Sequence, residues 1–186
     1  MEKKGVSRKE VEENISKMGD YVRIDYLSRC LKKEIDFDTK KFILVRLAGI
    51  YEERAMYGEA AKLFRISAEI NTTFQGKIND FVKSAEMFIK ANDFDEADVS
   101  FTRGGALGNT EQKLSIKLFK KQFYYTYALD CLKKDKRSHA VKVYEKLLEL
   151  NLDSIEKKRA EETLLDLYQK LGKIREYGML KRSIEG

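Results

Sequence analysis

The 186-residue sequence contains no proline, a single histidine, two cysteines and no long apolar run. Proline disfavours helix interiors by about 3 kcal/mol, so its absence beside abundant Lys, Glu, Leu, Ala and Ile favours an all-helical chain. A membrane-spanning helix needs roughly 20 apolar residues, so none is predicted. A single imidazole cannot build a histidine-rich metal site, and we expect no metal ion or other cofactor.

The two cysteines, Cys30 and Cys131, lie far apart and have no CxxC or Cys/His spacing around them. The first residues, MEKKGVSRKEVEENI, are charged and lack the apolar segment of a secretory signal. We therefore expect two free thiols in a reducing, intracellular compartment, the cytoplasm. Cys131 lies at a position equivalent to Tyr51 and Phe88 in a repeated pattern, so we expect it to be buried. We expect Cys30 to be partly exposed.

The charge of the chain is moderately basic. The sequence has 37 Lys and Arg against 31 Asp and Glu, which gives a net charge of +6 and a pI near 9.1. Such a balance permits binding to nucleic acid or to an acidic protein surface. Because the two signs are interspersed along the chain, solvated helix faces account for most of the charge without any ligand.

Two segments, residues 44–70 and 81–107, repeat one arrangement of apolar, small and aromatic residues. These positions are Leu44, Ala48 and Tyr51 in the first segment, and Phe81, Ala85 and Phe88 in the second. After a short turn, an alanine precedes an aromatic by four residues, and these pairs are Ala60 with Phe64 and Ala97 with Phe101. Small residues let two antiparallel helices approach, and the aromatics fill the groove beside the contact. The pattern therefore predicts two helical hairpins.

Less complete copies of the pattern occupy residues 124–150 and both ends of the chain. The equivalent second-helix positions are Ile24, Ala60, Ala97, Ala140 and Tyr177, at intervals of 36, 37, 43 and 37 residues. We predict an all-α, right-handed superhelical array, an α/α solenoid, of about five antiparallel hairpins in one domain over residues 1–186. The predicted hairpins are 6–35, 38–72, 76–108, 110–151 and 154–184.

This small–aromatic framework resembles the tetratricopeptide repeat and, more weakly, the extended hairpins of SNAP-type adaptors. The proline that usually closes each repeat is absent, and the spacing exceeds the 34 residues of that repeat. The resemblance implies a protein-interaction scaffold. Tetratricopeptide proteins that bind chaperone C-termini use a lysine–asparagine clamp that spans two adjacent repeats. Val45 and Val82 stand where that clamp needs polar groups, so no binding of this kind is expected.

The segment RGGALGNT places three glycines within five residues, which raises the alternative of a phosphate-binding loop. Such a loop needs a preceding strand and a following Lys-Ser or Lys-Thr, and the sequence has neither. We predict instead that Gly104 is a close-packing position. Gly104 and Gly105 should each weaken their helix by roughly 1 kcal/mol, with a kink or an early helix end. Asn109 and Gln112 fit a capping box at the start of the next helix.

No constellation of reactive side chains predicts an enzyme. His139 has no Ser, Cys or carboxylate partner in an obvious catalytic arrangement. Asp93, Asp95 and Glu96 lack the spacing and the glycine of a calcium loop, and acidic residues at a helix N-terminus explain them. We therefore predict no catalytic, cofactor-binding or metal-binding residues.

Residues just beside the buried stripe of each first helix should line the concave face of such an array. This set contains Arg46, Lys83, Lys90, Gln122, Tyr125 and Lys133. It is mainly basic with one aromatic, so an acidic peptide or an acidic helix is the expected ligand. The main prediction is thus a non-catalytic scaffold or adaptor.

The alternative is a helical-repeat RNA-binding protein or a nucleoprotein-complex subunit. Lys117, Lys120 and Lys121 precede a cluster of Phe and Tyr residues, which could stack on bases while the lysines contact phosphates. In the simpler interpretation, Tyr124 and Tyr127 face the core and the lysines face water.

The last hairpin also permits a homodimer. Terminal repeats normally have a polar outer face. This hairpin instead carries the apolar side chains of Leu164, Leu165, Tyr168, Tyr177, Met179 and Leu180.

Overall fold

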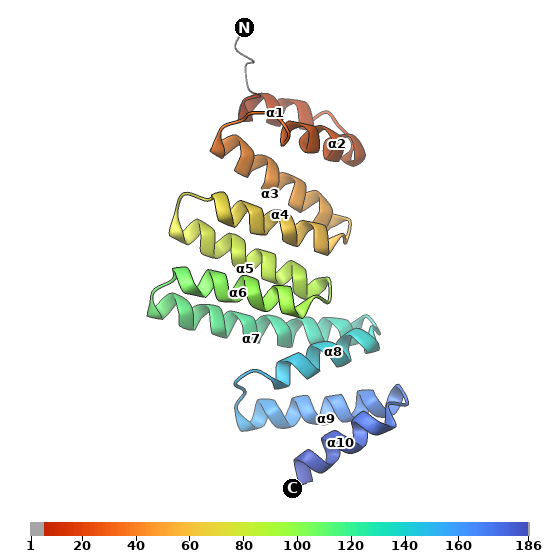
Figure 1. Cartoon of the computed structure of the whole chain (residues 1–186). Coiled ribbons are helices and arrows are strands. Elements are labelled where there is room, and N and C mark those ends of the chain that lie inside the picture. The colour runs from red at the N-terminus through yellow and green to blue at the C-terminus, as the bar shows by residue number, and fades with distance from the viewer. Residues whose placement is uncertain (1–5, 186) are drawn as a thin grey trace. The chain divides into compact units, whose positions relative to one another are not determined.

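The computed structural model describes residues 6–185, and the part of the chain that it describes is helical without any strand (Figure 1). Residues 1–5, which begin the charged segment noted above, and residue 186 lie outside the described range. The helices are α1 (Arg8–Ile15), α2 (Asp20–Cys30), α3 (Phe37–Glu53), α4 (Tyr57–Ile70), α5 (Phe74–Lys90), α6 (Phe94–Leu107), α7 (Thr110–Lys133), α8 (Arg137–Leu148), α9 (Ser154–Lys170) and α10 (Ile174–Glu185).

The chain divides into two compact units, unit 1 (Met1–Ile116) and unit 2 (Lys117–Gly186), with the boundary inside α7. In unit 1, consecutive helices from α3 to α6 pack against one another, and in unit 2 α9 packs against both α8 and α10. The prediction of an all-α chain of successive helical hairpins is therefore confirmed. The right-handed twist of the whole array and its single domain stay predictions.

Four hairpin turns share one backbone motif. A residue with positive φ occupies each turn, and these residues are Ala55 (56°), Asn92 (64°), Asp135 (53°) and Gly172 (67°). The amide that follows each one donates to a carbonyl five residues earlier, at 2.8–2.9 Å. This 6→1 bond is the mark of a Schellman motif, which satisfies the last carbonyls of a helix. The four residues recur at intervals of 37, 43 and 37, so the repeat found in the sequence is also a repeat of turn geometry.

Side chains cap the starts of several helices. Asp36 accepts a hydrogen bond from the Thr39 amide at 2.9 Å at the start of α3. Before α7, the Asn109 amide donates to Gln112 Oε1 at 2.9 Å, and the Gln112 amide donates to Asn109 Oδ1 at 2.8 Å. The predicted capping box is therefore present, and it fixes where α7 begins.

The glycine-rich segment packs in α6. A Cβ atom on Gly104 would lie 3.3 Å from the Phe81 Cβ, whereas one on Gly105 would meet nothing within 4 Å. Gly104 is therefore a close-packing position, as predicted. The expected early end is wrong, because α6 continues through both glycines to Leu107. Packing of Gly104 against Phe81 of α5 supports the helix at this point.

Both cysteines are free and buried. Cys30 is 1% exposed and packs in a core with Val11, Leu27 and Ile43, so the expectation of partial exposure is wrong. Cys30 of α2 packs with residues of α3. The first repeat is too degenerate in sequence to predict this contact. Cys131 is buried as predicted, and burial raises the pKa of its thiol.

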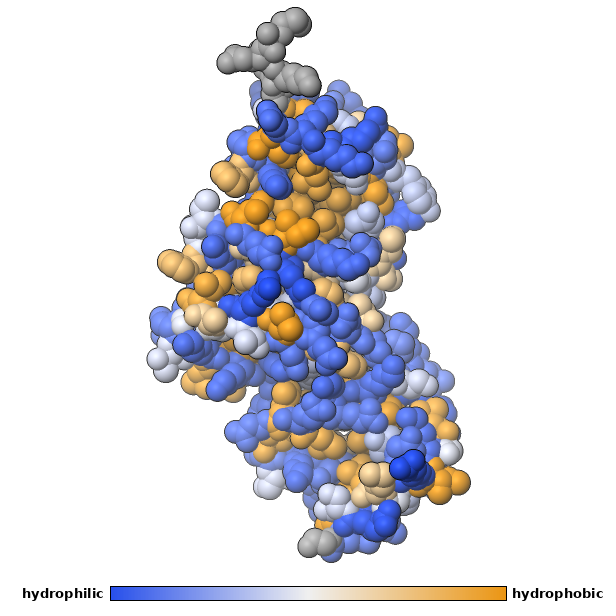
Figure 2. Space-filling view, in the orientation of Figure 1, coloured by the Kyte–Doolittle hydropathy of each residue, from blue (hydrophilic) through white to orange (hydrophobic). Residues whose placement is uncertain are grey.

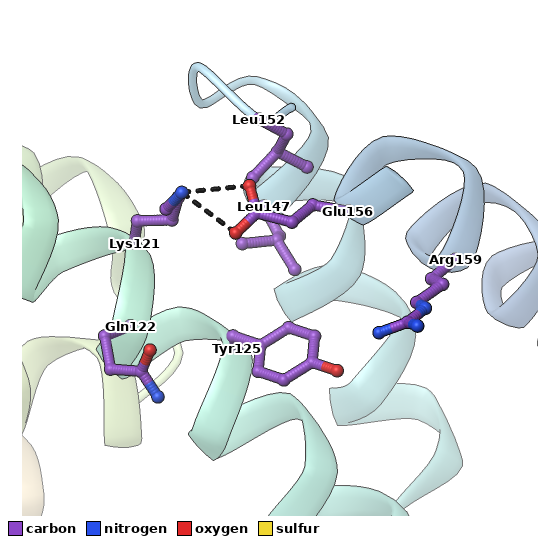
Figure 3. A pocket seen from close by; sticks show the side chains of 7 residues that line it. All are labelled: Lys121, Gln122, Tyr125, Leu147, Leu152, Glu156 and Arg159. Carbon is purple, nitrogen blue, oxygen red and sulfur yellow. Dashed lines mark hydrogen bonds and ion pairs between the residues drawn. The ribbon is translucent and has the colours of Figure 1, made fainter. Parts of the chain in front are cut away.

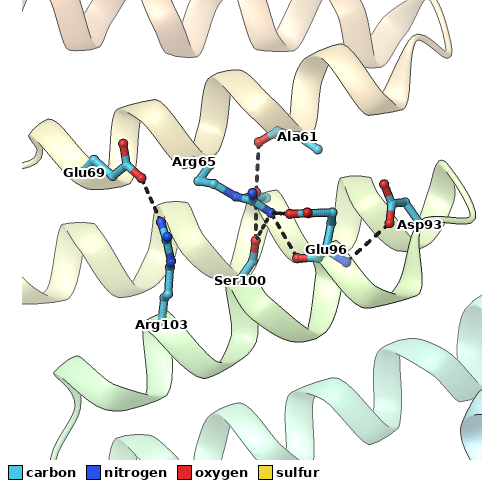
Figure 4. Close-up of polar contacts among 8 residues, drawn as sticks. Ala61, Arg65, Glu69, Asp93, Glu96, Ser100 and Arg103 are labelled. Atoms are coloured by element: carbon cyan, nitrogen blue, oxygen red, sulfur yellow. Dashed lines mark hydrogen bonds and ion pairs between the residues drawn. The ribbon is translucent and has the colours of Figure 1, made fainter.

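A polar seam joins α4, α5 and α6 in unit 1 (Figure 4). Arg65 Nη2 donates to the Glu96 carbonyl oxygen and to Ser100 Oγ, both at 3.1 Å, and it also pairs with the Glu96 carboxylate. The guanidinium carbon lies 4.5 Å from the centre of the Phe88 ring. On α5, Ser84 Oγ donates to the Ala61 carbonyl at 2.9 Å. These bonds connect polar groups of the three packed helices, so they fix the register of the helices.

Candidate peptide-binding site

The structure places the six predicted groove residues on first helices of hairpins: Arg46 on α3, Lys83 and Lys90 on α5, and Gln122, Tyr125 and Lys133 on α7. The first three belong to unit 1 and the last three to unit 2. The two groups have different neighbouring side chains within their units.

In unit 1, two of the predicted lysines are bound to the same glutamate. Glu52 Oε1 accepts from Lys90 Nζ at 2.9 Å and from Lys83 Nζ at 3.4 Å, and Lys83 also donates to Glu86 at 3.1 Å. Burial raises the pKa of Glu52, but the two lysines outweigh burial and hold that pKa below its ordinary value. Likewise, burial lowers the pKa of Lys83, but Glu86 and Glu52 leave it raised. Two lysines and two glutamates thus neutralise one another.

Arg46 lies at another place in unit 1. It lines a cavity of about 510 Å³ together with Val45, Gly49 and Ile50 of α3 and residues of α1 and α2. Its guanidinium carbon is 5.3 Å from the centre of the Phe42 ring. Figure 2 shows apolar surface gathered over the N-terminal part of unit 1. The lining of this cavity combines apolar side chains with charged side chains of both signs.

In unit 2, Gln122 and Tyr125 line a cavity of about 210 Å³ (Figure 3). Helix α7 supplies these two residues and Lys121, α8 supplies Leu147, the following loop supplies Leu152, and α9 supplies Glu156 and Arg159. The structure therefore brings two of the predicted residues together. Lys133, the exposed last residue of α7, does not line this cavity.

One side of the cavity is closed by an ion pair. Lys121 Nζ donates to both carboxylate oxygens of Glu156 at 2.9 Å. Glu156 also accepts from the Asp153 amide at 3.0 Å, as part of the capping box that begins α9. These hydrogen bonds, led by that from Lys121, hold the pKa of Glu156 below its ordinary value. This wall carries no net charge.

The opposite side of the cavity carries Arg159. In Figure 3 its guanidinium group points toward the Tyr125 hydroxyl group across the cavity. Among the described residues, no ion pair or hydrogen bond is found for the Arg159 side chain. The lining therefore has an excess of one positive charge, located at Arg159.

Sequence reasoning missed Arg159, although the signal was present. Arg159 precedes Tyr168 by nine residues, just as Gln122 precedes Cys131 by nine, and Tyr168 and Cys131 occupy the same repeat position. The register that selected Gln122 therefore also selects Arg159 once it is extended to the last hairpin. The pairing of Lys121 with Glu156 had no comparable signal, because it depends on how α9 packs.

The aromatic cluster of α7 divides between core and surface. Tyr124 is 1% exposed, in agreement with the predicted core position, and Tyr125 is half-buried beside the cavity. Phe119, Phe123 and Tyr127 form a ladder with ring centres 6.0 and 6.1 Å apart. Side-chain stacking within the helix thus occupies part of the surface that base stacking would need.

The last helix is weakly buried. None of the described residues of α10 is fully buried, and Ile174 is 83% exposed. Leu164 and Tyr168 of α9 are buried, and the Tyr168 hydroxyl donates to Glu145 at 2.7 Å. Of the apolar side chains that suggested a homodimer, those of α9 therefore contribute mainly to the core, and those of α10 remain at the surface.

Among residues 6–185, no group of three or more His, Cys, Asp or Glu side chains is placed to hold a metal ion. His139 is exposed near the start of α8. In the same part of the chain, every helix is too short or too polar to cross a membrane.

No protein-family model matches the sequence, and no curated protein matches it. Among solved structures, the chain is similar to the crystal structure of BtubC (BKLC) from P. vanneervenii. The identity is 13% and the TM-score 0.40, over 95% of this chain and 79% of that one. A likeness at this level assigns neither a partner nor an activity.

Proposed function

We propose that this chain is a non-catalytic protein-interaction scaffold that binds an acidic peptide or an acidic helix along the first helices of its hairpins. The observation that carries this proposal is the cavity of unit 2, which Gln122, Tyr125 and Arg159 line. Among the described residues, the Arg159 guanidinium has no ion-pair partner. An aromatic side chain with an arginine at a partly buried site is the composition typical of interaction hot spots. The tetratricopeptide-like arrangement of helices supports the same class of function.

The lysines of unit 1 have a smaller role in this proposal than the sequence suggested. Glu52 and Glu86 already neutralise Lys83 and Lys90, so an acidic ligand would have to displace these carboxylates. The net charge of +6 still attracts an acidic partner at long range, and this raises the association rate more than the affinity.

The nucleic-acid alternative has less support, because Lys121, Lys83 and Lys90 are all paired with carboxylates. The proposal also includes the cytoplasm as the compartment, in keeping with two free, buried thiols. A homodimer through the exposed apolar residues of α10 remains a further proposal.

An affinity capture from cell extract, with and without nuclease, tests the function. The variant Lys133→Glu/Arg159→Glu reverses two charges on α7 and α9. The matched control, Lys142→Glu/Arg175→Glu, reverses two exposed charges on the second helices α8 and α10. We expect a protein that survives nuclease, is lost with the first variant and is kept with the control.

Two other results would contradict the proposal. Recovery of RNA and RNA-bound proteins alone, lost after nuclease and steeply dependent on salt, would establish the nucleic-acid alternative. Equal capture by both double variants would show that the first helices do not carry the interaction.

A further inference from the structure

The cavity of unit 2 has the size of one side chain. Its volume of about 210 Å³ is below the roughly 300–1,000 Å³ of pockets that enclose whole small molecules. Leu147, which is 1% exposed, and the half-buried Leu152 give it an apolar surface. A ligand that fits must therefore combine a short apolar stem with a group that suits the polar side of the cavity.

The polar side of the cavity offers donors that have no partner among the described residues. Among the lining residues that the structure describes, Gln122, Tyr125 and Arg159 form no side-chain hydrogen bond or ion pair within the chain. Arginine donates from a planar fork, and neutral amide and hydroxyl groups donate as well. Lys121 is unavailable, because both oxygens of Glu156 hold it. The free donors match a carboxylate.

We propose that this cavity binds one glutamate side chain of a protein partner. Its carboxylate accepts from Arg159 and from the Tyr125 hydroxyl group, and its two methylene groups lie against Leu147 and Leu152. Gln122 donates its amide at the rim. The inference rests on the proposed function and specifies the residue that the scaffold recognises.

Three features favour a glutamate side chain over other anions. The stem of two methylene groups suits the leucine surface, whereas a free inorganic anion would leave that surface exposed. The excess charge of the lining is a single positive charge, which one carboxylate neutralises. The neighbouring Lys121–Glu156 pair shows that a glutamate spans the space between α7 and α9.

Blocked pentapeptides with a single variable group test the inference. The first probe is acetyl-Ala-Leu-Glu-Leu-Ala-amide, and its neutral isostere has Gln in place of Glu. A third probe has the Gln sequence but a free C-terminal carboxylate. Binding is followed by NMR through the shifts of the Tyr125 ring, the Arg159 side chain and the Leu147 methyl groups. We expect the Glu peptide to bind the wild-type chain at least tenfold more tightly than either other peptide.

Variants locate the effect at the cavity. Arg159→Gln should reduce affinity for the Glu peptide about tenfold and leave the weak binding of the Gln peptide unchanged. Tyr125→Phe should reduce it about threefold. Arg175→Gln, which removes an exposed arginine from α10, is the matched control and should have no effect. Each variant is checked by circular dichroism, and Arg159 is exposed, so its replacement should leave the fold intact.

Four results would overturn the inference. These are equal binding of the Glu and Gln peptides, unchanged affinity in Arg159→Gln, tighter binding of the peptide with the free C-terminus, and no shift at the cavity with any peptide. If the chain captures a protein partner and Arg159→Gln does not weaken this capture, the glutamate site is rejected and the proposed scaffold function is retained. If the chain captures no protein at all, the proposed function itself is rejected.

Discussion

Arg65 of unit 1 and Arg159 of unit 2 show two uses of the same side chain. Arg65 of α4 faces α6, where the Glu96 carbonyl oxygen and the Ser100 hydroxyl group accept hydrogen bonds from it. It also forms an ion pair with the Glu96 carboxylate, and Phe88 packs against it. Arg159 faces a cavity and has no such contacts among the described residues. The difference teaches that a basic composition alone does not identify a binding site. What matters is which cations the chain has already neutralised.

The largest expected effect separates these two arginines. Arg65→Ala would remove charge-assisted hydrogen bonds between packed helices and leave Ser100 without this donor, so the free energy of unfolding should fall by about 2 kcal/mol. Arg159→Ala should change it by less than about 0.5 kcal/mol, because the side chain is exposed. Urea denaturation of both variants provides the measurement. Equal losses would show that Arg159 is also a structural residue.

The two adjacent glycines of α6 provide a sharper comparison within unit 1. Gly105→Ala should stabilise the chain by about 1 kcal/mol, because it improves helix propensity and its Cβ meets no atom. Gly104→Ala gains the same propensity but places a Cβ 3.3 Å from that of Phe81, so the gain should vanish or reverse. Thermal unfolding of the two variants side by side measures the difference. A similar gain at both positions would mean that α5 moves aside easily.

The hairpin turns allow the same substitution to be compared between units. Ala55 in unit 1 and Asp135 in unit 2 have positive φ values of 56° and 53°. Glycine adopts this conformation without steric cost, so Ala55→Gly should stabilise unit 1 by about 0.5–1 kcal/mol. Asp135→Gly should give less, because aspartate tolerates the left-handed region better than alanine. Chemical denaturation tests the order, and a loss of stability in Ala55→Gly would contradict the turn geometry.

The smallest expected effect concerns pH and the Glu52 cluster. The pKa of Glu52 lies below its ordinary value of 4.5, so the folded state favours the charged carboxylate. This stabilisation is complete above pH 4.5 and is lost as the pH falls through the lowered pKa of the folded state. Its size should stay below about 1 kcal/mol because the cluster is partly exposed. Glu52→Gln should flatten the decline in stability on acidification, whereas an unchanged decline would assign it to other carboxyl groups.

Much of the fold followed from the sequence. The recurring small and aromatic positions identified successive hairpins, and Asn109 with Gln112 marked the start of α7. The weak first repeat left the burial of Cys30 unrecognised, because the core around it uses contacts from α1 and α3 that do not follow the repeat. One of the two predicted effects of Gly104 and Gly105, an early end of α6, is not found, because helix propensity does not include the support that packing against α5 gives at Gly104.

The candidate site could be predicted only in part. The helical register placed Gln122 and Tyr125 beside the buried stripe, and the cavity contains both. The same register placed Lys83 and Lys90 correctly on α5, but it gave no indication that Glu52 of α3 binds both. Contacts between residues more than 30 positions apart depend on the packing of neighbouring helices, which a local pattern does not contain.

The sequence by itself determined the helices, their pairing into hairpins and the faces that they bury, because these depend on periods of three and four residues and on turn residues. Tertiary structure decided which charges remain available. It brought Lys83 and Lys90 to Glu52 and Lys121 to Glu156, and it left Arg159 facing a cavity. The physical reason is that an ion pair requires two charged groups within about 4 Å, and only the packing of separate helices sets that distance.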